Sequence, residues 1–212
     1  MNYDGVIFDL DGVICFTDQY HYQAWKVIAD EIDTPFDEEI NNRLRGVSRM
    51  ESLAIILENY HGPALTTQQK EQLATQKNAI YRNLLQQMTP ADLHSDVKQA
   101  LDTLRSMGLK LAIGSSSKNA PLILARIGLD TFFDAVVDGN HIAHSKPHPE
   151  VFLKAAAAIG LPARRCLVVE DAEAGIEAAV AGGFNSAGIG VAATAKGVTH
   201  AITTLAQLPA LM

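Results

Sequence analysis

Two aspartates, Asp9 and Asp11, stand one residue apart directly after the apolar run GVIF. Residues two apart in an extended segment project to the same side, so both carboxylates can face one pocket while Leu10 packs the other way. Two carboxylates this close repel each other and need a cation or a shared proton. The pair therefore indicates metal binding or proton transfer. Because DG is also a common turn dipeptide, a plain turn explains this stretch equally well when it is taken alone.

Three further stretches carry groups suited to phosphate or metal chemistry. GSSSKN at 114–119 offers hydroxyls and backbone amides before a helix, a natural cradle for phosphate. SKPHPE contains the cation Lys146, and VVEDAEAG brings Glu170 and Asp171 after another apolar run. Each has an ordinary explanation by itself: a serine-rich turn, a surface lysine, or a helix N-cap at Asp171. Four acidic groups and one lysine at neighbouring strand ends are harder to explain as turns.

These groups fall within an alternation of expected strands and helices. Apolar, β-branched runs predict strands at 5–8, 109–114, 133–137, 165–170 and 186–190. Helical patterns lie between them at 95–107, 119–128, 149–160 and 172–183. The alternation predicts a doubly wound, Rossmann-like parallel sheet covered by helices on both faces. Ligands bind such sheets beyond the carboxyl ends of the strands, which is where the candidate residues stand.

The segment 17–88 breaks this alternation, because it shows helical periodicity without a convincing strand. We expect helices at 17–32, 36–44, 48–60 and 66–88. Thr17 and Ser48 look like N-caps, and Pro90 would close the last helix. The predicted protein is therefore an α/β core domain of residues 1–16 and 89–212 with an inserted all-helical cap domain, residues 17–88.

Composition limits the class of protein and its partners. The chain has 212 residues, 48% of them hydrophobic and 19% charged, as in ordinary soluble globular proteins. A net charge of -7 disfavours nucleic acid and anionic membrane as partners, and no apolar stretch reaches the ~18 residues of a membrane span. Cys15 and Cys166 are far apart, which predicts neither a disulfide nor a zinc site. We expect a cytoplasmic monomer that binds a small phosphorylated molecule.

The four stretches occur in the order DLDGV, SSSKN, KPHPE and ED, and together they resemble the haloacid dehalogenase superfamily of phosphotransferases over nearly the whole chain. The resemblance implies that Asp9 attacks phosphorus to form an aspartyl-phosphate and that Asp11 is the general acid/base. It also implies Mg²⁺, a hard cation that prefers oxygen ligands. The implied metal ligands are Asp9, the Asp11 backbone carbonyl, Glu170 and Asp171. The implied ligands of the transferring phosphoryl group are Ser115, Ser116 and Lys146.

The cap stretches LRGVSRMESL and QKNAIY are similar to those of the sugar-phosphate mutases of this superfamily, which interconvert the β-1-phosphate and the 6-phosphate of glucose through the 1,6-bisphosphate. A mutase must hold a second, distant phosphate. The resemblance assigns that phosphate to Arg49, Ser117, Lys118 and Asn119. It assigns the sugar pocket and the placing of the acid/base to Thr17, His21, Trp25, Arg45, Gly46, Val47, Ser48, Ser52 and Lys77.

Two other functions stay open at this point. The nearest is a Mg²⁺-dependent hexose-phosphate phosphatase, which would use the same Asp9 chemistry with water as the acceptor. The other, from a different class, is a catalytically inactive sugar-phosphate-binding regulatory protein. A cap that excludes water favours transfer to a sugar hydroxyl. The intact set of Asp9, Asp11, Lys146, Glu170 and Asp171 argues against the inactive protein.

Overall fold

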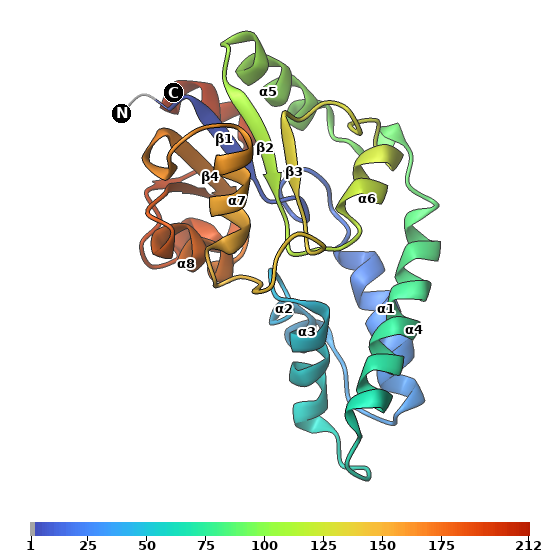
Figure 1. The fold of residues 1–212 in the computed structure, drawn as a ribbon. Helices are drawn as coiled ribbons and strands as arrows, with labels where there is room; N and C mark the ends of the chain where they lie inside the picture. Colours follow the sequence, from blue (N-terminus) through green and yellow to red (C-terminus); the bar gives the residue numbers. More distant parts are fainter. Residues whose placement is uncertain (1–2) are drawn as a thin grey trace.

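A six-stranded, all-parallel sheet forms the centre of the protein in the computed structural model, which describes residues 3–212 (Figure 1). Its strand order is β3-β2-β1-β4-β5-β6. The strands are β1 (Gly5–Phe8), β2 (Lys110–Gly114), β3 (Ala135–Val137), β4 (Cys166–Glu170), β5 (Asn185–Gly188) and β6 (His200–Ala201). The predicted doubly wound sheet is confirmed. The sequence analysis missed β6, because two residues are too few to show an alternating pattern.

Helices cover both faces of the sheet. They are α5 (Ser95–Ser106), α6 (Ala120–Arg126), α7 (Glu150–Ala158) and α8 (Glu173–Ala181), with short 3₁₀ helices η2 (Pro90–Asp92), η3 (Ala163–Arg165), η4 (Gly190–Thr194) and η5 (Leu205–Leu211). Val6 and Phe8 of β1 pack in one apolar cluster with α5 and α6, whereas Ile7 packs in another with α7 and α8. Successive side chains of a strand point to opposite faces, so one short strand anchors both layers.

The inserted segment forms an all-helical cap beyond the carboxyl ends of the strands (Figure 1). Its helices are α1 (Asp18–Glu31), α2 (Glu38–Asn42), α3 (Arg49–Ile56), η1 (Leu57–Asn59) and α4 (Thr67–Leu85). The cap has its own apolar core, which includes Trp25, Ile28, Leu53 and Ile56. The fold class is therefore the predicted one, a parallel α/β core with a helical cap. The domain boundaries at 16/17 and 88/89 stay a prediction.

Helix ends differ from expectation in two places. Ser48 is the predicted N-cap of α3, in a capping box with Glu51. Thr17 occupies the predicted N-cap position of α1, but its side chain makes no capping hydrogen bond to a helix N–H and donates to the Asp11 carboxylate. Helix α4 ends at Leu85, well before Pro90, which begins η2. Between residues 3 and 212, no helix is long and apolar enough to cross a membrane.

Candidate active site

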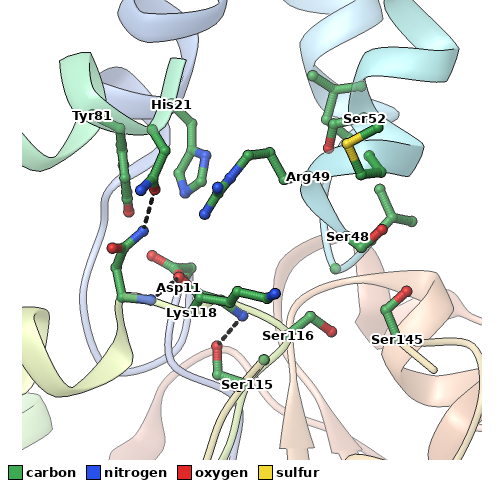
Figure 2. Close-up of a pocket in the computed structure, with 18 of the residues that line it drawn as sticks. Asp11, His21, Ser48, Arg49, Ser52, Tyr81, Ser115, Ser116, Lys118 and Ser145 are labelled. Carbon is green, nitrogen blue, oxygen red and sulfur yellow. Dashed lines mark hydrogen bonds between the residues drawn. The ribbon is translucent and has the colours of Figure 1, made fainter. Parts of the chain in front are cut away.

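A cavity of about 590 Å³ lies between the carboxyl edge of the sheet and the cap (Figure 2). Most of the predicted site residues line it, from both domains. They are Asp9, Asp11, His21, Trp25, Arg45, Gly46, Val47, Ser48, Arg49, Ser52, Lys77, Ser115, Ser116, Ser117, Lys118, Asn119 and Asp171. Three others, Thr17, Lys146 and Glu170, are wholly buried and do not line the cavity. Thr17 and Lys146 donate hydrogen bonds to the cavity carboxylates Asp11 and Asp9, and Glu170 accepts one from Lys146.

Asp9 stands at the end of β1 in a buried ionic cluster. Its backbone N–H donates to the Val169 carbonyl of β4 at 2.9 Å, which fixes the start of the loop. Lys146 donates from Nζ to both Asp9 Oδ1 and Glu170 Oε1. Burial raises the pKa of Asp9, and the Lys146 ammonium offsets part of that rise. Burial alone would lower the pKa of Lys146, but the two carboxylates raise it above its ordinary value. Lys146 is therefore a fixed cation behind Asp9.

Asp9, Glu170 and Asp171 form a buried acidic cluster, with ligand oxygens within 4.8 Å of one another. Burial, followed by the charge of Glu170, raises the pKa of Asp171 to about 7. One lysine cannot neutralise three carboxylates, and a set of oxygen donors is what Mg²⁺ prefers. Two glycines leave room for the cluster. A Cβ at Gly12 would lie 2.1 Å from Asp171 Oδ2, and one at Gly175 would lie 1.9 Å from Glu170 Cδ. The residues present fit a magnesium ion.

A second group of possible metal ligands, His144, His148 and Glu150, lies on the loop that carries Lys146. Both histidines are exposed. The Glu150 carboxylate already accepts from the backbone N–H groups of Ala143 and His144, and it pairs with Lys154. These interactions hold the pKa of Glu150 down at about 2. Because the Glu150 carboxylate is already occupied by these hydrogen bonds and this ion pair, the buried acidic cluster is the better cation site.

Asp11 lies near Asp9 and contacts Thr17, the residue before α1 of the cap. Thr17 donates its hydroxyl to Asp11 Oδ1. Burial raises the pKa of Asp11, with the Thr17 hydrogen bond acting in the opposite direction. A carboxyl group with a raised pKa can hold and release a proton nearer to neutral pH, which is what a general acid/base needs.

Lys77 and His21 form a buried basic pair on the cap wall. Lys77 Nζ lies 2.9 Å from His21 Nδ1 and 5.0 Å from the centroid of the Trp25 ring. Burial, followed by the charge of the nearby Arg49, lowers the pKa of Lys77 to about 7. Burial also lowers the pKa of His21 well below its ordinary value. The cap therefore presents a lysine that changes charge near neutral pH.

Two cations line the cavity, one from the cap and one from the core. Arg49 begins α3, and Lys118 follows β2; neither side chain has a hydrogen-bond or ion-pair partner within the described part of the chain. Figure 2 shows Arg49 reaching into the pocket from α3 toward His21. The hydroxyl of Ser116 is likewise buried without a partner. Unpaired cations and an unpartnered hydroxyl make the cavity suited to anions.

Arg45, predicted as a substrate or cap residue, pairs with carboxylates of both the cap and the core. It lines the cavity, but its guanidinium pairs with Asp18 of α1 and donates to Asp171 Oδ2 at 3.2 Å. Arg45 therefore connects the cap to the acidic cluster of the core. In this arrangement its donors are directed to carboxylates rather than into open space.

Three cavity or cap–core residues escaped the sequence analysis: Asn78, Tyr81 and Arg82, all on α4. The Asn119 side chain donates to Asn78 Oδ1 at 2.9 Å and accepts from Arg82 at 3.2 Å. Tyr81 lines the cavity next to His21, with ring centroids 4.1 Å apart. The spacing of four residues from Lys77 to Tyr81 and from Asn78 to Arg82 puts each pair on one helix face. That spacing, extended from Lys77, was the available signal.

The comparisons with known proteins agree with this geometry. The family model of haloacid dehalogenase-like hydrolases matches residues 3–183. The chain is 44% identical over 188 residues to a β-phosphoglucomutase of Bacillus subtilis, covering 87% of this chain and 82% of that protein. It is 34% identical over 185 residues to a fructose-1-phosphate phosphatase of Escherichia coli, covering 87% and 95%. The crystal structure of a β-phosphoglucomutase from Clostridium difficile superposes with a TM-score of 0.90, at 34% identity, covering 97% of this chain and 93% of that one.

Proposed function

The chain belongs to the haloacid dehalogenase-like hydrolase family, and from that premise we propose that it acts as a β-phosphoglucomutase, interconverting β-glucose 1-phosphate and β-glucose 6-phosphate through β-glucose 1,6-bisphosphate. The similarity to the Bacillus subtilis enzyme over most of both chains supports this choice. The family match supports phosphoryl transfer in general, and the choice of glucose phosphates as substrates is our specific proposal.

The proposed reaction uses the two aspartates in turn. The Asp9 carboxylate attacks phosphorus of the bisphosphate, the bond from phosphorus to the sugar oxygen breaks, and Asp11 gives its proton to that oxygen. The resulting monophosphate leaves, and β-glucose 1-phosphate binds in its place. Its C6 hydroxyl gives a proton to Asp11 as the oxygen takes the phosphoryl group from Asp9, which forms the bisphosphate again. The bisphosphate turns round in the cavity, and Asp9 now attacks the phosphate at C1, so that β-glucose 6-phosphate leaves. Whenever the bisphosphate is bound, Asp9 is free and Asp11 is protonated, as at the start.

Other residues would position the phosphoryl group and limit the access of water. Mg²⁺ held by Asp9, the Asp11 backbone carbonyl, Glu170 and Asp171 would neutralise charge on the phosphoryl oxygens. Ser115 and Ser116 would donate to the same oxygens, and Lys146 would keep Asp9 ionised. The helical segment 17–88 would close as a cap and exclude water from the aspartyl-phosphate.

The observation that carries the proposal is the unpaired Arg49 on the cap wall of the cavity, near His21 and Lys77, with Lys118 as a second unpaired cation from the core. A phosphatase needs one phosphate site. A mutase that works through a bisphosphate must hold a second phosphate while the first one reacts, and it must do so in two opposite orientations of the sugar. Arg49 suits this task, because a guanidinium fork binds phosphate in a bidentate way.

The test compares two phosphate donors on an Arg49→Ala variant. Mutase turnover should fall by roughly 30-fold or more, the loss expected when a desolvated charged contact is removed. Phosphorylation of Asp9 by acetyl phosphate involves no far phosphate and should be nearly unchanged. Arg49→Lys keeps the charge but loses the fork, so it should recover only part of the turnover. Arg43→Ala, at an exposed arginine paired with Glu58, is the matched control. Equal losses with both donors would reject Arg49 as the second phosphate ligand.

A hexose-phosphate phosphatase is the second candidate, and the similarity to the Escherichia coli fructose-1-phosphate phosphatase favours it. The two functions differ in the acceptor of the phosphoryl group on Asp9: a sugar hydroxyl or water. Contacts between cap and core, such as Arg45 with Asp171, favour a closed cavity and hence the mutase. An inactive regulatory protein is the third possibility, and the complete set of Asp9, Asp11 and Lys146 speaks against it.

A further inference from the structure

Tyr81 has a buried hydroxyl that the reaction described above does not use. Its side chain is 1% exposed, and it lines the cavity from α4. The hydroxyl has no hydrogen-bond partner; within residues 3–212, only the Ser116 hydroxyl shares that condition among buried side-chain nitrogen and oxygen atoms. Burying a polar group without a partner destabilises a fold, so an unpartnered one calls for an explanation.

The surroundings of Tyr81 hold its ring firmly and leave its hydroxyl free. The His21 ring packs on it at 40° with a centroid separation of 4.1 Å, and Lys77 Nζ lies 4.4 Å from its centroid. The Thr17 hydroxyl lies close enough to the Tyr81 hydroxyl to act on its pKa in the downward direction, but it donates to Asp11 and makes no hydrogen bond of good geometry to Tyr81. Figure 2 shows the Tyr81 hydroxyl pointing toward the side of the pocket where Asp11 lies. The ring position is fixed by these contacts and by the apolar cluster that also contains Val6 and Phe8 of β1, so the hydroxyl is a preoriented donor.

The ionisation of Tyr81 fits a donor rather than an acceptor. Burial, followed by the charge of Asp11, raises the pKa of Tyr81 well above its ordinary value, so the phenol keeps its proton at any working pH. A neutral hydroxyl cannot neutralise a phosphate, which Arg49 and Lys118 are better suited to bind. It is suited to a neutral oxygen placed between the reacting aspartates and Arg49. In a sugar bisphosphate, that position belongs to the sugar ring.

We propose that the Tyr81 hydroxyl donates a hydrogen bond to an oxygen of the bound sugar, and that Tyr81 is thereby a substrate-positioning residue of the cavity. The inference rests on the proposed sugar-phosphate function. When the sugar binds, the hydroxyl gains the partner that it lacks in the free protein. The unpartnered hydroxyl therefore lowers the stability of the free protein, and in the complex it helps to bind and orient the sugar.

The experiment uses Tyr81→Phe, which removes one oxygen and keeps the ring against His21 and Lys77. Three quantities are measured on the full chain: the melting temperature, kcat/KM with β-glucose 1-phosphate, and the rate of Asp9 phosphorylation by acetyl phosphate. We expect an unchanged or higher melting temperature, a drop of about tenfold in kcat/KM, and an unchanged rate with acetyl phosphate. Tyr22→Phe, at a half-buried cap tyrosine that stacks on Phe36 outside the cavity, should change none of the three.

Two results would overturn the inference. If kcat/KM stays within twofold of the wild type, the hydroxyl contacts no sugar. If acetyl phosphate and the sugar phosphate are affected alike, Tyr81 acts on the aspartates instead. Should the wild type not turn over glucose phosphates, the glucose assignment fails on its own, and the same comparison is made with fructose 1-phosphate. A wild type that turns over neither sugar phosphate refutes both the function and the role of Tyr81.

Discussion

Arg82 of the cap donates a hydrogen bond of 3.2 Å to the side chain of Asn119 in the core. The same amide donates to Asn78 Oδ1 at 2.9 Å, so two residues of α4 use both ends of it. Asn119 is nearly fully buried, and its backbone N–H donates to Ser117 Oγ at 3.2 Å. The cap helix is therefore connected, through one amide, to the loop that we propose binds phosphate.

A second polar contact joins the two domains on another side of the cavity, where Ser145 donates to Glu51 at 2.5 Å. Glu51 is also the capping partner of Ser48, so this contact ties the start of α3 to the core loop that contains Lys146. The hydrogen bonds to Glu51 lower its pKa. Together with the contacts of Arg45 and Arg82, the hydrogen bond between Ser145 and Glu51 joins the cap to the core around the cavity. A cap that excludes water requires such contacts.

Arg82→Ala tests whether the contact with Asn119 matters for water exclusion. Arg82 is exposed, so the stability of the fold should change by less than about 1 kcal/mol. We expect a looser cap and a severalfold higher ratio of free phosphate to glucose 6-phosphate, measured in one reaction mixture. Arg43→Ala removes an exposed arginine that does not contact the core and should leave the ratio unchanged. The same ratio in both variants would show that the contact has no influence on the acceptor.

Asp9→Asn and Asp11→Asn should fail at different steps. The Asp9 amide cannot attack phosphorus, so turnover and labelling by acetyl phosphate should both disappear, while circular dichroism stays that of the folded protein. Asp11→Asn keeps the nucleophile, so labelling by acetyl phosphate should persist. Transfer to or from a sugar hydroxyl should stall, because that oxygen needs a proton. Loss of labelling in the Asp11 variant would contradict this division of tasks.

Magnesium affinity should depend on pH through Asp171. With a pKa of about 7 in the metal-free protein, this carboxyl group is mostly protonated at pH 6, and a bound cation must displace the proton. The dissociation constant for Mg²⁺, measured by calorimetry, should rise roughly tenfold from pH 8 to pH 6. Asp171→Ala should weaken binding at both pH values, whereas His148→Ala, in the exposed histidine cluster, should not. Loss of binding in the histidine variant alone would place the metal outside the acidic cluster.

The stability of the fold should rise with pH through Lys77. Its pKa falls from 10.5 to about 7 on folding, so between these values the unfolded chain binds one more proton than the folded one. The free energy of unfolding should therefore increase with pH across that window, by up to about 1.4 kcal/mol per pH unit. Lys77→Met should flatten this slope in urea unfolding between pH 7 and pH 9.5. Lys70→Met, at an exposed lysine of the same helix, should leave the slope unchanged. Equal slopes in the wild type and both variants would contradict a neutral, buried Lys77.

The core fold was predictable because its strands are short, buried and bounded by helical patterns. The strand at 5–8 was found to the residue, and Asp9 and Asp11 follow it as expected. β6 was missed because His200 and Ala201 carry no periodic signal. Thr17 stands at the N-cap position of α1 as expected, but its hydroxyl donates to the Asp11 carboxylate and accepts from no helix N–H. A local sequence pattern predicts a partner within the same helix, whereas Asp11 is brought to Thr17 by the loop after β1.

The site was predictable where residues follow strands and less so where the cap meets the core. The resemblance placed Arg45 among the substrate and cap residues, but only the structure pairs it with Asp171, 126 positions away in the chain. Lys146 taken alone suggests a surface lysine, yet it is completely buried between two carboxylates. The sequence alone does not show that three residues of α4 reach the cavity or the core, because the position of α4 over the core depends on tertiary packing. These residues are Asn78, Tyr81 and Arg82.

The central claim is that the phosphoryl group on Asp9 passes to a sugar hydroxyl rather than to water. The direct measurement incubates the pure protein with Mg²⁺, β-glucose 1-phosphate and a trace of β-glucose 1,6-bisphosphate, and follows glucose 6-phosphate and free phosphate in the same sample. The proposed mutase predicts glucose 6-phosphate in large excess over free phosphate, and a strong dependence of the rate on the bisphosphate. Free phosphate equal to or above glucose 6-phosphate would contradict the claim and favour the phosphatase, and the absence of both products would favour the inactive binding protein.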